Sequence, residues 1–203
     1  MPVISDVRAN KGLVEIVSGG TTLLRVPAAH FAKCPVSVEE DIDLENYVDR
    51  LAAVQLADGY EAALSSLDRS DRTAFQLASA LRRKGYVAPA VDAILERLSS
   101  TGLIDDARYA RRMAESQAKK PSGIYAFKRR LRAKGISDED AEEALACFDD
   151  AQQQQAAQRA AEKLWDRYAA LPPREARAKL SQALARRGFA WDVIEAVVDR
   201  LAD

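Results

Sequence analysis

The side chains best able to do chemistry in this chain are cations concentrated in its middle. Residues 108–134 hold ten Lys or Arg and one acid, a net charge of +9. The flanking segments are acidic, with net charges of −8 over residues 36–71 and −5 over residues 135–203. The overall charge of −1 therefore conceals a strong asymmetry. A basic centre of this kind predicts a polyanionic partner or an acidic protein surface.

Helix capping explains some of these cations, because one or two of them in a last turn complement the helix dipole. Residues 128–134 carry five positive charges within seven residues, and residues 108–112 add three more. That excess predicts anion binding. The predicted contact residues of this segment are Arg108, Arg111, Arg112, Lys128, Arg129, Arg130 and Arg132. Matching places elsewhere in the chain extend the set to Arg82, Arg83, Arg186 and Arg187.

Residue types that support catalysis are scarce. His30 is the only histidine, so a histidine triad or a multi-histidine metal site cannot form within one chain. Cys34 and Cys147 are widely separated, and no glycine-rich phosphate loop is present. Asp105 and Asp106 stand where acids typically cap a helix. We therefore predict a protein that is not an enzyme and that needs no metal and no cofactor.

Three similar stretches position the cations. Each runs from a leucine through basic residues to a glycine, at residues 81–85, 131–135 and 184–188. Gly85, Gly135 and Gly188 are 50 and 53 residues apart, which defines an internal repeat of about fifty residues. Glycine supplies the left-handed residue that commonly ends a helix. The base directly before each glycine, for example Lys84 or Lys134, also fits a plain capping role, and Arg187 holds that place in the third stretch.

Apolar residues recur at six places around each glycine, four and eight residues before it and six, nine, ten and thirteen after it. This spacing places them on one face of each flanking helix. Further helices are expected upstream, at residues 60–67, 106–118 and 156–169, so each repeat is predicted to hold three helices. The eighteen positions are Leu77, Leu81, Val91, Ile94, Leu95, Leu98, Phe127, Leu131, Ala141, Ala144, Leu145, Phe148, Leu180, Leu184, Ile194, Val197, Val198 and Leu201.

Helix-start signals support these boundaries. Side chains that can accept a backbone N–H favour the N-cap position, and proline is tolerated in a first turn. The signals are Thr73 with Gln76, Ser122, Ser137 with Asp140, and the pair Pro172 and Pro173.

The first 35 residues differ from the rest. Residues 13–17 and 21–26 are rich in β-branched residues and flank a Gly19-Gly20 turn, which predicts a β-hairpin with residues 3–7 as a candidate third strand. An acidic connector and a linker helix follow, and Asp58-Gly59 is expected to break the chain. The predicted divisions are 1–35 for the extension, 36–58 for the connector and helix, and 59–105, 106–152 and 153–203 for the repeats.

The predicted fold is therefore mainly α. It consists of three tandem three-helix, helix-turn-helix-like repeats, preceded by the small β-hairpin and the linker helix. Tandem repeats of this size are expected to form an elongated, curved array in which only neighbours touch.

Four aromatic residues have expected places. Trp165 and Trp191 are predicted to fill the core or the space between helices. Tyr109 and Tyr125 flank the basic segment, where either helix packing or partner contact fits them.

Signals for export or membrane insertion are absent from the sequence. No apolar run approaches the ~20 residues of a membrane span, and residues 1–10 lack the basic and apolar regions of a signal peptide. Two widely spaced cysteines fit a reducing compartment. We predict a cytoplasmic protein, not bound to a membrane, that acts as a monomer.

Three stretches resemble the bacterial RecX family. The first is LDRSDRTAFQL at 67–77, closing on LRRKGY at 81–86, and the second is LSSTGLIDDARYAR at 98–111. The third comprises Lys179-Leu180, LARRGF at 184–189 and Ile194. The likeness covers roughly residues 60–203.

That resemblance implies three tandem three-helix units and a modulator of the recombinase RecA. Members of the family lie in the groove of the RecA filament on single-stranded DNA, where they commonly inhibit ATP hydrolysis, strand exchange and coprotease action or block filament growth. They have no catalytic residues, and residues 108–132 fall where the family is basic. This chain departs from the pattern at Ala185, where the other repeats have arginine. The acidic stretch at residues 36–71 and the hairpin before it lie outside the family's common core.

Two other functional classes stay open. A DNA-binding protein with tandem helix-turn-helix units could act without RecA, although a net charge of −1 is unusual for a protein that binds DNA alone. An inert helical scaffold is the third class. It predicts that charge reversal at Lys128, Arg129 and Arg130 changes no activity.

Overall fold

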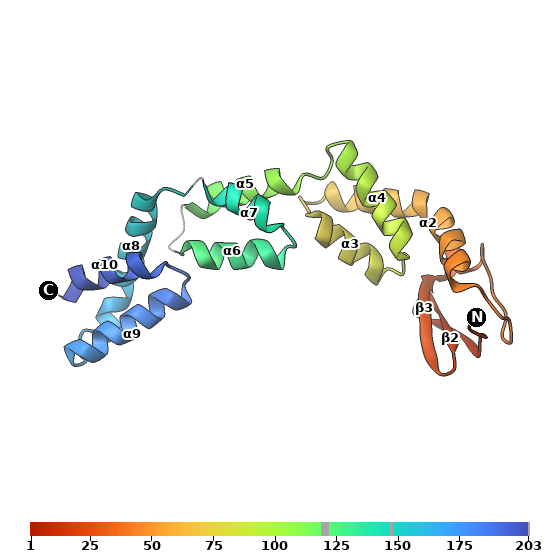
Figure 1. Ribbon diagram of the computed structural model, residues 1–203, viewed down its shortest axis with the longest axis horizontal. Coiled ribbons are helices and arrows are strands. Elements are labelled where there is room, and N and C mark those ends of the chain that lie inside the picture. The colour runs from red at the N-terminus through yellow and green to blue at the C-terminus, as the bar shows by residue number, and fades with distance from the viewer. Residues whose placement is uncertain (119–121, 147, 203) are drawn as a thin grey trace. The chain divides into compact units, whose positions relative to one another are not determined.

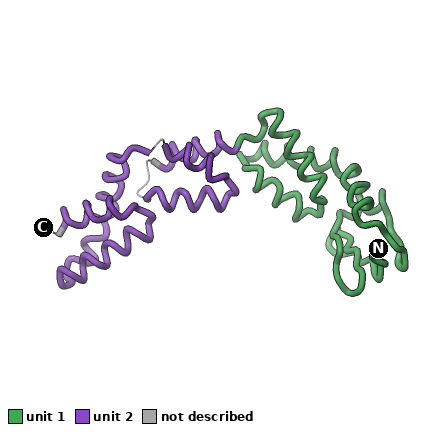
Figure 2. Tube along the Cα trace, viewed as in Figure 1, with its two compact units in different colours: residues 1–105 green, residues 106–203 purple. Residues whose placement is uncertain are grey.

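The chain divides into two compact units, Met1–Asp105 and Asp106–Asp203 (Figure 2). The computed structural model describes residues 1–118, 122–146 and 148–202. Lys119 and Lys120 of the basic segment, and Cys147, lie outside the described residues.

Unit 1 begins with an antiparallel sheet in the order β1-β2-β3, formed by Asp6–Asn10, Leu13–Ser18 and Thr21–Pro27 (Figure 1). Gly19 and Gly20 have positive φ, 54° and 81°, as a two-residue hairpin turn requires. The predicted hairpin is confirmed. The third strand lies at residues 6–10 instead of 3–7, because a second tight turn at Lys11 and Gly12 pairs Asn10 with Leu13.

One long helix replaces the break expected after residue 58. A short helix, α1 (Ala28–Phe31), is followed by α2 (Leu44–Leu67), which begins where the Asp43 carboxylate accepts two backbone N–H groups. Gly59 lies inside α2, where a Cβ would come within 2.5 Å of Ile94 Cδ1. Glycine in a helix interior costs only about 1 kcal/mol relative to alanine. The expectation was wrong because this glycine serves close helix packing.

The second half of α2 packs against α3 (Ala74–Arg83) and α4 (Ala88–Ser100) to form the first repeat. The predicted capping box of α3 is confirmed. Thr73 Oγ1 accepts the N–H of Gln76 at 3.2 Å, and Gln76 Oε1 accepts the N–H of Thr73 at 3.2 Å.

Unit 2 holds two further three-helix groups. The middle repeat comprises α5 (Asp106–Ala118), α6 (Ile124–Ala133) and α7 (Asp138–Leu145). The third comprises α8 (Asp150–Tyr168), α9 (Pro173–Arg186) and α10 (Trp191–Ala202). The divisions expected after residues 58 and 152 therefore fall inside α2 and α8.

The helix starts of unit 2 match two of the three expected caps. The Ser137 hydroxyl accepts the N–H of Asp140 at 3.0 Å, and α9 opens at Pro173. Ser122 does not cap α6, whose N-cap is Gly123. A Cβ on Gly123 would lie 2.1 Å from the Gly188 carbonyl oxygen, so close backbone packing requires glycine at this helix start.

The three glycine turns share one hydrogen-bond pattern. Gly85, Gly135 and Gly188 have φ of 89°, 77° and 82°. Each glycine N–H bonds the carbonyl three residues back, at 2.9–3.0 Å, and the following N–H bonds the carbonyl of the leucine that opened the stretch, at 3.1–3.4 Å. This is the Schellman motif, so the predicted role of glycine as the helix stop is confirmed.

The predicted apolar faces form the cores of the repeats. Fifteen of the eighteen positions are buried, and Leu95, Phe148 and Leu201 are partly exposed. Their burial in three separate clusters confirms a mainly α fold of three three-helix repeats behind a small sheet.

Hydrogen bonds from neighbouring elements stabilise the glycine turns at Gly85 and Gly188. In unit 1, the fully buried Gln55 of α2 donates through Nε2 to the Gly85 carbonyl at 3.0 Å and accepts the N–H of Val87 at 2.7 Å. In unit 2, the Gly188 carbonyl accepts the N–H of Tyr125 at 2.9 Å. Each turn therefore satisfies its backbone groups through a segment outside its own helix pair.

Of the four aromatic residues considered, two pack against the cores and two are exposed. Trp165 and Tyr109 are partly buried against the cores of their repeats, as predicted for Trp165. The expectation for Trp191 was wrong, because this first residue of α10 is 65% exposed. Tyr125, near the start of α6, is 55% exposed.

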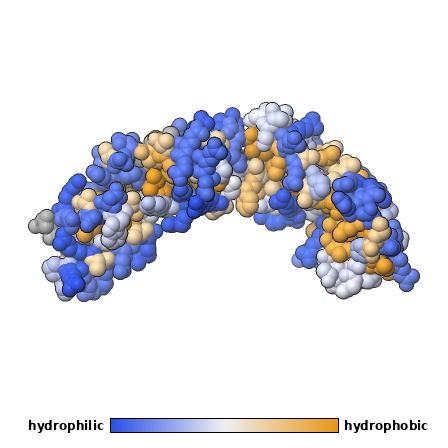
Figure 3. Space-filling model, in the orientation of Figure 1, coloured by the Kyte–Doolittle hydropathy of each residue, from blue (hydrophilic) through white to orange (hydrophobic). Residues whose placement is uncertain are grey.

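Hydrophilic residues cover much of both units on the face seen in Figure 3, and apolar residues reach that surface in separate groups. Among the described residues, no helix combines the length and the apolar character that a membrane span needs.

Candidate protein and nucleic-acid interface

The predicted contact residues all lie at the surface. Ten are exposed, and Lys128 is half-buried, with 25% of its side chain exposed. The ten exposed residues are Arg82, Arg83, Arg108, Arg111, Arg112, Arg129, Arg130, Arg132, Arg186 and Arg187.

Helix α6 presents the central part of the basic segment. Phe127 and Leu131 are fully buried and fix which face of the helix points inward. The helical repeat then places Tyr125, Arg129 and Arg132, at spacings of four and three, on one outward stripe. An exposed aromatic ring beside arginines is a common arrangement at nucleic-acid surfaces.

Helix α7 supplies acids to this basic surface. Its sequence carries five acids in eight residues, 138–145. Lys128 Nζ pairs with Glu142, Arg111 with Glu143 at 3.4 Å, and Arg132 with Asp138 at 2.9 Å. The Arg132 guanidinium donates a hydrogen bond to Asp138 and lowers the pKa of that carboxyl below its usual range.

These pairs change the interpretation of the charge excess. The sequence predicts an external anion for the eight cations because they would otherwise repel one another. Three of them instead have an anion on the third helix of the same repeat. Exposed pairs of this kind contribute little to stability, and solvent and salt weaken them, so they leave the cations open to exchange for another anion.

Arg129 and Arg130 are the cations of α6 that α7 does not neutralise. Arg130 donates to the Ser122 hydroxyl at 3.1 Å and to the Ala126 carbonyl at 3.4 Å, both neutral acceptors. Arg129 is exposed and forms no ion pair with a described residue. Within α6, these two arginines therefore keep a positive charge that no acid of α7 balances.

The first repeat holds a basic site that the sequence did not indicate. Arg82 pairs with Asp92 at 3.4 Å, but Arg83 lines a hollow of about 190 Å³ between α2 and α3. Three further cations share that lining: Arg69, Arg72 and Lys84. We call this feature, defined by these four residues, the basic hollow. Arg69 lies within the acidic segment 36–71. The net charge of that segment, −8, conceals the local group of cations.

An available signal in the sequence was spacing. Arg69 and Arg72 follow the end of one helix, and Arg83 and Lys84 end the next helix. Two short basic pairs that flank a single ten-residue helix can meet where that helix packs against its predecessor.

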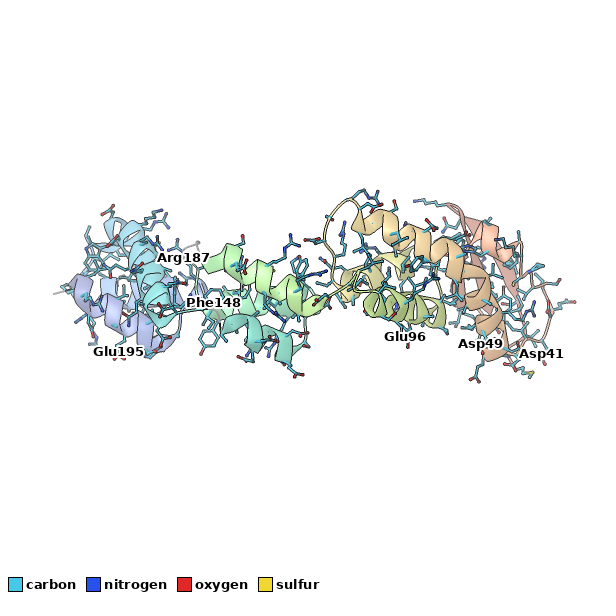
Figure 4. The ribbon with its side chains drawn as sticks, turned by 90° about the horizontal axis from the view of Figure 1, so that it is seen from above. Asp41, Asp49, Glu96, Phe148, Arg187 and Glu195 are labelled. Atoms are coloured by element: carbon cyan, nitrogen blue, oxygen red, sulfur yellow. The ribbon has the colours of Figure 1, made fainter. Side chains whose placement is uncertain are left out.

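The third repeat uses one of its predicted residues internally. Arg187 Nη1 approaches the Ala160 carbonyl of α8 at 3.4 Å. Figure 4 labels Arg187 among the side chains of unit 2. In the middle repeat, Lys134 at the equivalent place lies 5.3 Å from the centre of the Tyr109 ring. These contacts favour a structural role for the bases directly before Gly135 and Gly188. Arg186 stays exposed.

An equivalent aromatic residue occurs in two of the repeats. Phe75 and Tyr125 each stand ten residues before their glycine, and both are about half exposed. The third repeat has Ala178 at this place. The exposed ring is therefore shared by the first and middle repeats.

The lone histidine has a packing role in unit 1. His30 Nε2 lies 2.9 Å from Asp58 Oδ2 and joins α1 to α2, and the hydrogen bond lowers the pKa of the Asp58 carboxyl. Cys34 is buried. Within the described ranges, no three His, Cys, Asp or Glu side chains gather as a metal site requires.

Comparison with protein families places each repeat separately. Residues 60–98 match the first three-helix domain of RecX, residues 105–145 the second and residues 150–198 the third. The order of the matches along the chain is the order of the domains in the family.

Individual relatives span nearly the whole chain. Regulatory protein RecX of Limosilactobacillus reuteri is 30% identical over 99% of this chain and 77% of its own length. The protein of the same name from Bacillus subtilis is 26% identical over 99% of this chain and 78% of its own.

Solved structures agree with these matches. A crystal structure of regulatory protein RecX, 27% identical, superimposes with a TM-score of 0.69 over 98% of this chain and 100% of that one. The structure of RecX from Lactobacillus salivarius, 31% identical, gives 0.67 over 73% of this chain and 97% of that one. With three domain matches in order and relatives along its full length, this chain belongs to the RecX family of regulatory proteins.

Proposed function

We propose that this chain is a non-catalytic regulator that binds the RecA filament on single-stranded DNA and lowers its recombinase, ATPase and coprotease activity. The observation that carries this proposal is membership of a family named for regulation, combined with exposed arginines on every repeat. The protein would act by occupying a surface, without a cofactor, as a monomer in the cytoplasm.

Several weak contacts are the physical basis of the proposed binding. Exposed ion pairs are each worth only about 0–1 kcal/mol, so one basic patch gives little affinity. Three repeats in one chain can engage neighbouring sites of a repeating filament, and each contact then raises the effective concentration of the next. Arg129 and Arg130 supply the positive surface of the middle repeat, and the exposed Phe75 and Tyr125 rings add apolar area.

The direct test measures the DNA-dependent ATPase activity of RecA while the purified full chain is titrated in. We expect the rate to fall as the protein approaches stoichiometric ratio with the filament. An unchanged rate at molar excess would contradict a regulator that acts on this activity.

Charge reversal locates the effect. The double variant Arg129→Glu/Arg130→Glu should need a several-fold higher concentration for the same inhibition. A matched control is Lys163→Glu/Arg167→Glu, two exposed cations on α8 of the same unit. Equal potency of both double variants would remove the middle repeat from the proposed interface and favour the inert scaffold there.

A second candidate is a DNA-binding protein that acts without RecA. The four cations around the basic hollow favour it, because they supply an anion-binding site that needs no recombinase. Affinity for single-stranded DNA alone, with its salt dependence, separates the two functions. Tight binding with several counterions released, and no change in RecA activity, would support this second candidate.

A further inference from the structure

Small residues form part of the lining of the basic hollow, together with Leu77 and Leu81. Ala62, Ala63 and Ser66 face it from α2, and Ala80 faces it from α3. Short side chains leave open a volume of about 190 Å³, which exceeds the roughly 30 Å³ share of one water molecule several-fold. The space is large enough for a phosphate-sized group.

Cations surround this space without internal partners. None of the side chains of Arg69, Arg72, Arg83 and Lys84 forms an ion pair with a described residue, and no described acid lines the hollow. The loop acids Asp68 and Asp71 lie outside its lining. Four positive charges thus line a hollow whose described lining holds no acid.

Helix capping accounts for only part of this charge. A helix C-terminus carries roughly half a negative elementary charge, so the ends of α2 and α3 contribute about one together. With the adjacent loop acids Asp68 and Asp71 also counted, the four cations still exceed these negative charges by about one. A bound anion would relieve the remaining repulsion.

The other repeats differ at the corresponding places. In a glycine-based alignment, Ala62 and Ala63 correspond to Arg112 and Met113 in the middle repeat. In the third repeat they correspond to Trp165 and Asp166, and the place of Arg72 is held by Glu175. The combination of a small floor and four cations therefore belongs to the first repeat.

We propose that the basic hollow binds a phosphate group of a single-stranded nucleic acid. The planar arginine fork suits two oxygens of one phosphate. Arg69 and Arg72 can approach it from the loop after α2, and Arg83 can approach it from the end of α3. One phosphodiester carries a single negative charge and does not neutralise all four cations. The remaining positive charge attracts the neighbouring phosphates of the same strand. A lone carboxylate on a protein partner carries no such second charge, which favours a nucleic acid over an acidic peptide. This site lies outside the predicted middle interface and does not require RecA.

The test uses the full chain and a fluorescently labelled oligothymidylate, with no recombinase present. The variant Arg72→Gln/Arg83→Gln should bind about ten-fold more weakly at moderate salt, and the slope of log K against log salt should fall by about 1.4, or 0.7 per lost phosphate contact. The variant Arg72→Lys/Arg83→Lys keeps both charges and should retain most of that slope. Both variants change exposed residues, and circular dichroism verifies their folding.

A matched control separates the hollow from the overall charge. Arg50→Gln/Lys33→Gln removes two exposed cations from the same unit, and neither residue lines the hollow. Arg50 lies sixteen residues before Ser66 on α2, roughly 24 Å along the helix axis. Equal losses of affinity in the two Gln double variants would overturn the proposal.

The source of the phosphate is resolved by NMR of the amides of Ala80 and Lys84. If these amide chemical shifts change with micromolar oligothymidylate but not with millimolar inorganic phosphate, the hollow binds a nucleic-acid strand. Shifts with inorganic phosphate that compete with the strand assign it to phosphate groups generally, including free nucleotides. No shift with either probe would refute the site. RecA inhibition is measured separately, so it can survive the loss of this site.

Discussion

The first and middle repeats share a frame and differ in how they use their charge. Both have a buried leucine before a glycine turn and an exposed aromatic ring ten residues before that glycine. In the middle repeat, α7 carries five acids, and three of its carboxylates pair with the bases of α5 and α6. In the first repeat, four cations line a hollow that no described acid enters.

This difference separates formal charge from available charge. The middle segment has the highest positive charge along the sequence, yet three of its ten cations pair with acids of its own repeat. The first repeat lies partly in an acidic segment and still gathers four unpaired cations in one place. The surface potential depends on which helix faces meet and not on the sum over a stretch of chain.

The largest expected effect concerns the support of the first turn. Gln55→Leu keeps the volume of the side chain but leaves the Gly85 carbonyl and the Val87 N–H buried without a partner. Each such group costs about 1–3 kcal/mol, so we expect a loss of about 3 kcal/mol in the free energy of unfolding. Urea denaturation measures it, with the exposed Asn46→Ala on α2 as the control. A loss equal to that of the control would show that the turn does not need Gln55.

Alanine substitutions at Gly85 and Gly135 compare how tightly the glycine turns of the first and middle repeats are packed. Gly85→Ala places a methyl group 2.9 Å from the Arg25 carbonyl oxygen in addition to its strained φ of 89°. Gly135 is exposed, so alanine there should meet mainly the cost of the left-handed conformation, about 1–2 kcal/mol.

We therefore expect Gly85→Ala to destabilise the protein by about 2 kcal/mol more than Gly135→Ala, measured by thermal or urea unfolding. Gly102→Ala, with φ of 70° and nothing within 4 Å of the added Cβ, calibrates the conformational cost alone. Equal losses at all three glycines would mean that the first turn is not tightly packed.

Removing acids from α7 tests whether they mask the middle repeat. Glu142→Gln releases Lys128, and affinity for oligothymidylate should rise roughly two- to five-fold, the range of one exposed ion pair. Glu139→Gln is the matched control, because Glu139 is exposed on the same helix and forms no ion pair with a described residue. If both variants bind equally well, the masking by specific pairs is wrong and only the overall charge matters.

The smallest effect is the acid titration of one pair. The pKa of Asp138 is lowered below its usual 3.8 by the hydrogen bond from Arg132. A carboxyl with a lowered folded pKa stabilises the fold above its unfolded pKa and loses that contribution as the pH falls through the folded value. The pair should therefore stay intact at neutral pH and break only below about pH 3.8.

Carboxyl ¹³C NMR of Asp138 follows this titration directly. Arg132→Gln should move the midpoint back toward 3.8. A midpoint that does not respond to this substitution would show that Arg132 does not hold the carboxylate.

Much of the fold could be predicted because its signals are local. Apolar spacing, the Thr73 and Ser137 caps and the glycine stops each depend on residues within a few positions of one another. The errors arose where distant segments meet. Gly59 lies within a helix, where its lack of a side chain leaves room for Ile94. Gly123, and not Ser122, is the N-cap of α6, because the backbone of the Gly188 turn packs closely against residue 123.

The candidate site was less predictable for the same reason. The sequence identified the arginines of α5 and α6 as surface cations, and all of them are exposed. It gave no partner for Lys128, Arg111 or Arg132, because their acids stand 6 to 32 residues away on another helix. The role of these residues in binding stays a prediction.

By itself, the sequence determined the three-helix repeat, its cores, its turns and the family to which the chain belongs. These follow from short-range periodicity and backbone capping, which each repeat specifies for itself. Only the tertiary structure decided which cations face acids, which line a hollow and which glycines serve close packing. Those outcomes depend on the faces that helices present to one another, and ion pairs and cavities form only once the chain has folded.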